Sequence, residues 1–189
     1  MPYKRFSNII GFDDAPFPRD YHGNVKVVGA VFADLRFDGV IIGEIEKDGS
    51  DSAQKLAKLV AESKFAQHTQ LVMLQGVTFA GFNVVDVFHL NGQLGLPVLV
   101  VSRNLPDMES IRKALTTRVP EGKKKWALIE KLGPMEPVAK VFVQRVGLSA
   151  EQAASVIEHF TVHSQIPEPI RTAHLIAGAL TNRQSRGHP

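Results

Sequence analysis

The apolar positions up to residue 46 are grouped in short β-prone runs. Residues 7–12 contain a pair of isoleucines and a phenylalanine, residues 25–33 are rich in valine, and residues 35–46 alternate between apolar and polar towards their end. A Pro-rich turn follows the first run and an Asp-Gly pair gives a further turn signal, as expected of short connections between strands. The pattern predicts three consecutive antiparallel strands.

From residue 48 onwards the apolar spacing becomes helical between buried strands. A polar loop with helix-capping residues precedes a predicted helix over residues 53–63. Two nearly all-apolar strands, residues 70–76 and 96–103, flank a predicted helix over residues 82–94, which is typical of a parallel crossover. The remaining predicted elements are helices over residues 107–117, 126–132, 149–160 and 170–180, a strand over residues 140–146, and a polar tail over residues 181–189.

This order of elements predicts an α/β fold. Three antiparallel strands followed by parallel strand–helix units give a ribonuclease H-like mixed sheet with helices on both faces. Of the 189 residues, 44% are hydrophobic and 22% are charged, so we expect residues 1–189 to form one domain with a sizeable core.

The composition restricts where the protein is expected to be located and which partners it is expected to bind. No apolar run is long enough to span a bilayer and no basic-then-apolar leader is present, so we expect a cytoplasmic protein with no membrane association. The absence of cysteine excludes disulfides and thiolate metal sites. A net charge of +3 permits a polyanionic partner without requiring one, and the oligomeric state stays open.

Acidic residues stand at the ends of predicted strands. The first strand delivers two adjacent carboxylates, Asp13 and Asp14, which point to opposite faces because neighbours on a strand do so. Asp48 and Asp51 lie in the loop before the first helix. Oxygen ligands from several strand ends suit Mg²⁺ or Mn²⁺ at a phosphodiester-cleaving site, so these four residues are candidate metal ligands. A turn residue or a helix cap is the competing interpretation for each of them.

A glycine-containing turn is a second candidate site. Residues 75–83 read Gln-Gly-Val-Thr-Phe-Ala-Gly-Phe-Asn, and two glycines there indicate either close approach of the backbone to a ligand or tight packing of helix on sheet. On the first interpretation, Gly76, Thr78 and Asn83 contact substrate. No Gly-Lys-Ser/Thr follows, which excludes a P-loop.

Several basic residues are candidates to bind along the phosphate backbone of a nucleic acid. For the three consecutive lysines among them, exposure to solvent is the simpler interpretation. The candidates are Lys123, Lys124, Lys125, Arg171, Arg183 and Arg186.

Four separated stretches resemble the endonuclease V family. Residues 11–13, Gly-Phe-Asp, resemble the family's Gly-Val-Asp, and residues 75–78 stand where the family has Asp-Gly-His-Gly. Residues 96–103, Leu-Pro-Val-Leu-Val-Val-Ser-Arg, resemble its Leu-Pro-Thr-Ile-Gly-Val-Ala-Lys. Residues 167–174, Pro-Glu-Pro-Ile-Arg-Thr-Ala-His, are similar to its late Pro-Glu-Pro-x-Arg-x-Ala-His signature. The order holds from about residue 7 to 176, and the chain resembles a compact branch of endonuclease-V-like proteins.

The resemblance implies a ribonuclease H-like fold, Mg²⁺ or Mn²⁺ as cofactor, and cleavage of DNA or RNA near inosine. It implies that Asp13 is a metal ligand, that His174 assists near the metal or the attacking water, and that Arg103 replaces a lysine on the scissile phosphate. Asp48 or Asp51 would replace the family's middle glutamate. Without the resemblance, a histidine in an apolar helix is more simply interpreted as structural.

Two features depart from the family pattern. Gln75 replaces the third metal carboxylate, and the segment over residues 46–52 is too short for the Pro-Tyr-Ile-Pro wedge that separates strands at the lesion. We therefore expect a metal-dependent nuclease with altered or lost inosine specificity, in which Asp13, Asp51, His174 and Arg103 are catalytic. The alternatives are a nucleic-acid-binding protein of the same fold without chemistry, or a small-molecule or partner-binding module built on residues 76–83.

Overall fold

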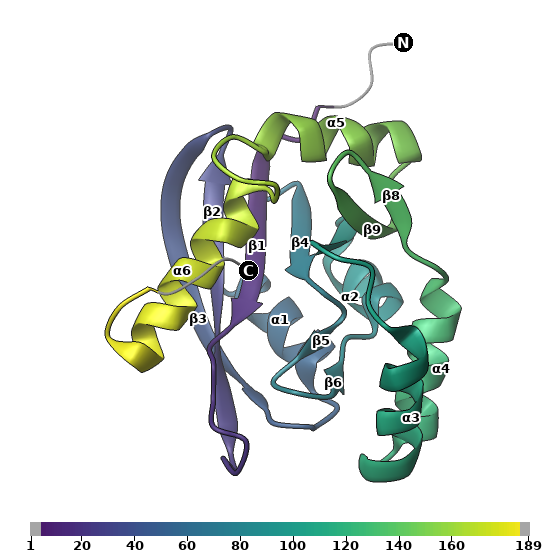
Figure 1. Cartoon of the computed structure of the whole chain (residues 1–189). Helices are drawn as coiled ribbons and strands as arrows, with labels where there is room; N and C mark the ends of the chain where they lie inside the picture. The colour runs from purple at the N-terminus through teal and green to yellow at the C-terminus, as the bar shows by residue number, and fades with distance from the viewer. Residues whose placement is uncertain (1–4, 186–189) are drawn as a thin grey trace.

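A computed structural model describes residues 5–185. Within them, a seven-stranded sheet has the order β3-β2-β1-β4-β7-β9-β8 (Figure 1). The strands of this sheet are β1 (Asn8–Asp14), β2 (Asn24–Ala33), β3 (Arg36–Glu46), β4 (Leu71–Gln75), β7 (Val98–Ser102), β8 (Glu136–Val138) and β9 (Val141–Val146). The helices are α1 (Ser52–Ala61), α2 (Val87–Leu94), α3 (Met108–Arg118), α4 (Gly122–Leu132), α5 (Ala150–Phe160) and α6 (Glu168–Asn182).

The predicted order of strands is confirmed. β1, β2 and β3 pair antiparallel in sequence, and β1, β4 and β7 pair parallel. β9 closes the other side by pairing antiparallel with β7. β8, a short strand next to β9, was not predicted, because three residues that include a proline carry no readable alternation.

Helices cover both faces of the sheet, and β1 contributes to both cores. Its residues alternate: Ile9 packs with the apolar faces of α5 and α6, whereas Ile10 and Phe12 pack with those of α1 and α2. Gly11 faces α6 so closely that a side chain at this position would meet the backbone of Pro169. The last helix is therefore seated directly on the first strand.

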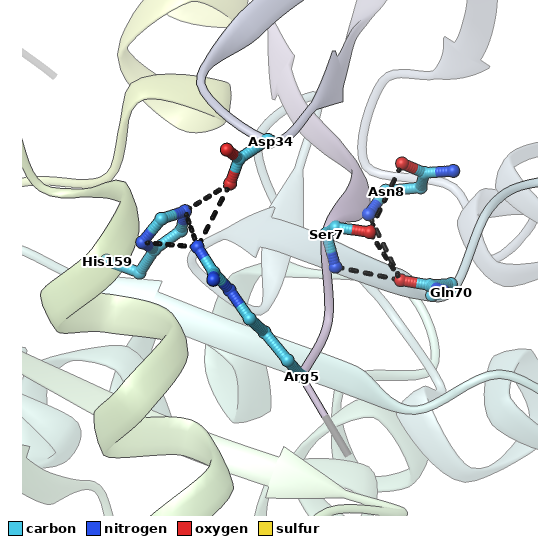
Figure 2. Close-up of polar contacts among 6 residues, drawn as sticks. All are labelled: Arg5, Ser7, Asn8, Asp34, Gln70 and His159. Carbon is cyan, nitrogen blue, oxygen red and sulfur yellow. Dashed lines mark hydrogen bonds and ion pairs between the residues drawn. The ribbon is translucent and has the colours of Figure 1, made fainter.

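The amino end of β1 is fixed by polar contacts (Figure 2). The Gln70 side-chain oxygen accepts hydrogen bonds from the backbone N–H groups of Ser7, at 2.8 Å, and Asn8, at 3.1 Å. Asp34, in the turn after β2, contacts His159 of α5, and Arg5 lies beside this pair. These contacts fix the register of β1 against β2 and β4, and hence the position of the carboxylates at its other end.

The predicted helix over residues 82–94 is wrong at its start. Residues Asn83–Val84 form β6, which pairs antiparallel with β5 (Thr78–Phe79), and α2 begins only at Val87. The Asp86 side chain accepts a hydrogen bond from the His89 N–H at 3.0 Å, so Asp86 is the N-cap. Strands of two residues are too short to show a periodicity, which is why this small sheet was missed.

The helices α3 and α4 form a pair beside the sheet, at the end where β5 and β6 lie (Figure 1). Leu115 of α3 and Ile129 of α4 are buried together with Val84 of β6. α4 starts at Gly122, four residues earlier than the predicted start at Trp126, because the charged run at its beginning is helical. No helix within residues 5–185 is long and apolar enough to cross a membrane.

The close approach of α6 to β1 predicts that Gly11→Ala destabilises the protein. The added methyl group would meet the Pro169 backbone, and overpacking of this kind costs about 1–3 kcal/mol in the free energy of unfolding. Urea denaturation monitored by circular dichroism would measure it. Gly92→Ala is the matched control, since that glycine lies in α2 with open space around it and alanine is the better helix former. Equal stability of the two variants would contradict the packing argument.

Candidate active site at the carboxyl ends of the parallel strands

The parallel strands β1, β4 and β7 end at one edge of the sheet, which we call the carboxyl edge. Gly11 pairs with Met73 and Gln75 pairs with Val101, so Asp13 and Gln75 occupy the next row on the face that α6 covers. Arg103 follows two residues after Val101, at the end of β7. Ends of parallel strands are where α/β proteins bind ligands.

Asp13 and His174 form the central contact of this edge. Asp13 is only 5% exposed, and its Oδ2 lies 2.8 Å from Nδ1 of His174 on α6. The second oxygen of Asp13 accepts a hydrogen bond from the Asp14 N–H at 2.9 Å. The carboxylate thus fixes the ring orientation of His174, as carboxylates do for histidines that move protons or assist at metal sites.

Asp14, the last residue of β1, contacts both the turn over residues 80–82 and the carboxyl group of the neighbouring Asp13. Its Oδ2 accepts a hydrogen bond from the Ala80 N–H at 2.7 Å. Burial raises the pKa of Asp14 to about 7, and the neighbouring charge of Asp13 adds to this shift. The carboxylates of Asp13 and Asp14 therefore repel each other at the end of β1, and a cation bound there would reduce the repulsion.

Asp48 binds the same turn as Asp14. Its Oδ1 accepts a hydrogen bond from the Phe82 N–H at 2.8 Å and fills the space that a side chain at Gly81 would need. The Asp48 N–H donates to the Ala80 carbonyl at 2.9 Å. The turn over residues 80–82 therefore binds both Asp14, at the end of β1, and Asp48, in the loop that follows β3.

Asp51 and Asn83 have structural contacts. Asp51 Oδ1 accepts hydrogen bonds from Asn83 Nδ2, at 2.8 Å, and from the Glu46 N–H, at 3.2 Å. Asn83 is fully buried, and its oxygen accepts from the Ser52 N–H at the start of α1. The Asn83 amide is thus enclosed and holds the start of α1. The expected contact of Asn83 with substrate stays a prediction. The described hydrogen bonds and ion pairs of Asp51 include none to Asp13 or Asp14.

Gln75 presents an unusual oxygen at the carboxyl edge. Its Oε1 is buried and has no hydrogen-bond partner within residues 5–185. Gly76, which follows, has a φ of 71° with open space around it, so it serves the turn and not close helix packing. Thr78 is half-buried in β5. A buried acceptor without a donor is costly, and it calls for a partner such as a metal ion or a water molecule.

A basic cavity lies beside Arg103. It has a volume of about 350 Å³, and Arg103, Lys140 and His163 line it. Arg171 binds Glu168 at 3.2 Å, and the buried Glu168 also accepts a hydrogen bond from the His163 N–H at 3.1 Å. Arg171 is thus half-buried and tied to its own helix, whereas Arg186 lies outside the described residues.

The buried lysine of α4 was not predicted. Lys125 is 3% exposed, and its Nζ donates to the Asp48 carbonyl at 2.5 Å, while burial lowers its pKa. The expected solvated surface is wrong for this residue. Its position four residues before the buried Ile129 was the signal, because residues at this spacing share one face of a helix.

No group of three or more His, Cys, Asp or Glu side chains within residues 5–185 is arranged to hold a metal ion. The oxygen donors at the carboxyl edge are the carboxylates of Asp13 and Asp14 and the amide oxygen of Gln75. Such a set of oxygens fits a hard divalent cation and does not fit zinc or copper.

Comparison with known proteins identifies the class and the family. One similar structure is endonuclease V from Ciona intestinalis in complex with a 24mer DNA that contains an inosine followed by a ribo-adenosine. It superposes with a TM-score of 0.63 at 15% identity, over 94% of this chain and 87% of the other. The human endonuclease V structure gives a TM-score of 0.55. The protein has the ribonuclease H-like fold of endonuclease V, as its sequence predicted.

The family follows from closer relatives. A UPF0215 protein of Deinococcus radiodurans is 48% identical over 185 residues, which cover 98% of this chain and 94% of the relative. A crystal structure of a protein of unknown function from Archaeoglobus fulgidus gives a TM-score of 0.85 at 30% identity, over 92% of this chain and 97% of the other. The family model described as endonuclease dU matches residues 5–181. This chain belongs to the endonuclease dU family.

The raised pKa of Asp14 predicts a pH-dependent gain of stability in Asp14→Asn. The pKa rises from 3.8 to about 7 on folding, so the folded protein binds this proton more tightly and loses stability as the pH rises through that window. Above pH 7 the metal-free variant should melt on the order of 5 °C higher than the parent, and near pH 4 the difference should vanish. The amide oxygen of the variant can still accept from the Ala80 N–H.

Scanning calorimetry in a chelator between pH 4 and 8 measures this dependence. Asp20→Asn is the control, because it removes the same charge from an exposed loop. A metal-free Asp14→Asn protein that melts no higher than the parent at pH 8 would contradict the raised pKa of Asp14 in the folded protein.

Proposed function

We propose that this protein is a metal-dependent endonuclease that hydrolyses a phosphodiester bond in nucleic acid containing a deaminated base. The observation that carries the proposal is the Asp13–His174 contact at the carboxyl edge, beside a second carboxylate and the unpartnered oxygen of Gln75. The family description, endonuclease dU, and the inosine-containing DNA of the endonuclease V complex support nucleic acid with a deaminated base as substrate.

In this proposal, Asp13, Asp14 and Gln75 hold Mg²⁺ or Mn²⁺. Asp48 shares the turn over residues 80–82 with Asp14 and is the further acidic candidate. A bound divalent cation would polarise the phosphate and lower the pKa of a bound water. Asp51 is the weaker candidate, since Asn83 and the Glu46 N–H occupy one of its oxygens.

The remaining roles belong to basic side chains. His174, oriented by Asp13, lies where it can exchange a proton with the attacking water or the leaving oxygen. Arg103 offers a guanidinium to the phosphate from the end of β7, Lys140 adds a second positive charge, and His163 adds a hydrogen-bonding ring. Arg171 acts through Glu168, which joins it to the loop that carries His163.

A nucleic-acid-binding protein without chemistry is the second candidate function. The observation that favours it is Gln75, whose neutral oxygen is a poorer ligand than a carboxylate, together with the missing three-residue acidic cluster within the described chain. Metal binding and cleavage separate the two functions.

The proposed nuclease predicts cleavage that depends on Asp13. A panel of labelled single- and double-stranded DNA and RNA, with deoxyuridine, inosine or neither, is incubated with Mg²⁺ or Mn²⁺. Asp13→Asn should lower the cleavage rate by about 100-fold or more, because the metal and His174 both lose their carboxylate. Asp38→Asn, an exposed acid on β3, should retain full activity. Cutting that survives in Asp13→Asn would indicate a contaminating nuclease, and absence of cutting by the parent would leave the binding function.

Restoring a carboxylate on β4 should strengthen metal binding. Gln75→Asp adds a charged oxygen in the row of Asp13, so Mn²⁺ should bind about tenfold more tightly, whereas Gln75→Leu should weaken binding. Titration followed by electron paramagnetic resonance of free Mn²⁺ measures both without any activity assay. Equal Mn²⁺ affinities of the parent and the two variants would exclude Gln75 from the metal site.

A further inference from the structure

The connection from β1 to β2, residues 15–23, leaves the carboxyl edge directly after Asp13 and Asp14. Figure 1 shows it projecting beyond the sheet, at the end where β5 and β6 lie. We call it the aromatic loop, because it presents Phe17 and Tyr21 between prolines and polar residues. No residue of this loop belongs to the proposed metal site or to the basic surface around Arg103.

The aromatic loop is held in one conformation by its own contacts. The Tyr21 hydroxyl donates to the Asn24 carbonyl at 2.7 Å, and the rings of Tyr21 and Phe17 lie 6.3 Å apart at a tilt of 43°. Lys47 Nζ donates to the carbonyls of Arg19 and Tyr21 and lies 5.5 Å from the centre of the Phe17 ring. Tyr21 nevertheless remains 37% exposed. An aromatic ring that is fixed and exposed is a platform on which a base can stack.

Through its hydrogen bonds, Lys47 also connects the aromatic loop to the segment that precedes α1. Residues 47–51 connect β3 to α1, and this is the segment too short to carry a strand-separating wedge. The aromatic loop lies against its first residue, Lys47, which precedes Asp48. The aromatic loop therefore occupies a position from which it can contact a base near the carboxyl edge.

A cavity of about 280 Å³ lies under the aromatic loop. Its lining includes Phe17, Tyr21, Lys26, Glu44 and Leu180. This volume is at the small end of ligand pockets and suits a single base better than a whole nucleotide.

The cavity is on the same face of the sheet as Asp13. Ala15, which also lines it, stands two residues after Asp13 and packs in the core beneath α6. Two residues along a strand span about 7 Å. Leu180 and Thr181 close the cavity from α6, about two turns beyond His174. One nucleic acid strand could thus have a phosphate at Asp13 and a nearby base in the cavity.

The floor of the cavity carries one donor and one acceptor. Lys26 and Glu44 are directly opposite each other on β2 and β3, so their side chains project from the same face. Neither side chain has a hydrogen bond or ion pair with another part of the described chain. Deamination of cytosine leaves a carbonyl beside a ring N–H, and an ammonium group with a carboxylate complements this pair of atoms.

We propose that this cavity receives an unpaired, deaminated base, which stacks on Tyr21 and is read by Lys26 and Glu44. The proposal deepens the proposed nuclease function and rests on it for the nature of the substrate. Stacking on Tyr21 holds a base displaced from its partner, as the extrusion of a target base requires. Lys26 and Glu44 give the preference for uracil over cytosine.

Binding of a fluorescent single-stranded oligonucleotide with one central uracil tests the cavity separately from catalysis. Ca²⁺ replaces Mg²⁺ and Mn²⁺ to prevent cutting, and anisotropy gives the dissociation constant. Tyr21→Ala should weaken binding about tenfold, because one stacking contact is lost. Tyr21→Phe keeps the ring and should bind within about twofold of the parent. Phe88→Ala is the matched control, since Phe88 on α2 is similarly exposed at 38% and is not among the residues that line the cavity.

Base preference is tested with Glu44→Gln. The parent should prefer the uracil oligonucleotide over the cytosine one, and Glu44→Gln should reduce this ratio towards one while binding is retained. Tyr21→Ala and Glu44→Gln proteins that match Phe88→Ala in affinity and in base preference would overturn the proposal.

The outcomes also separate this proposal from the nuclease function. Cleavage that depends on Asp13 but is unchanged in Tyr21→Ala and Glu44→Gln would retain the nuclease and reject the cavity. Binding that depends on Tyr21, without any cleavage by the parent, would support the cavity and reject the nuclease. A parent protein that neither binds nor cuts any oligonucleotide would reject both.

Discussion

The contact between Asp13 and His174 joins the first strand to the last helix, across 161 residues of sequence. It can form only if α6 approaches β1 closely, which the absence of a side chain at Gly11 permits. It also needs the register of β1 to be fixed, which the hydrogen bonds of Gln70 provide at the opposite end of the strand. A buried carboxylate without a partner would be costly, so this contact and the packing of α6 depend on each other.

A second constraint acts through the turn over residues 80–82. Its backbone N–H groups bind the carboxylates of Asp14 and Asp48, and Gly81 leaves the space that Asp48 fills. Lys125 holds the carbonyl of Asp48 from α4. The α3–α4 pair, the turn and β1 are therefore linked through Asp14 and Asp48, which makes the carboxyl edge sensitive to how α4 packs.

Much of the fold could be predicted from the sequence, since long apolar runs and helical spacing report burial directly. The three antiparallel strands, the parallel crossover and α6 follow from such runs. β5 and β6 could not be predicted, because two-residue strands have no period and owe their existence to the turn between them. Among the candidate site residues, the sequence located Asp13 and His174 through the family resemblance, and the structure brings them into contact.

Other site features depend on tertiary contacts that a single sequence does not contain. The run of charges around Lys125 obscures the helical spacing that indicates its burial. The enclosure of Asn83 accompanies its hydrogen bonds to Ser52 and Asp51. The aromatic loop is recognisable in the sequence only as a Pro-rich end of a strand. Its relation to Lys26 and Glu44 needs the register of β2 and β3.

Because Gln75 is neutral, the proposed metal site carries less negative charge than it would with a third carboxylate. Burial raises the pKa of Asp14 to about 7 with help from the charge of Asp13, and a third carboxylate in the row of Asp13 would add to this repulsion. Replacing it by an amide keeps an oxygen ligand and lowers this repulsion, at the cost of a weaker attraction for a cation. Mg²⁺ is commonly held by one or two carboxylates together with the phosphates of the substrate. In the proposed enzyme, the substrate phosphate would supply the missing negative charge, so metal and nucleic acid would bind cooperatively at the carboxyl edge.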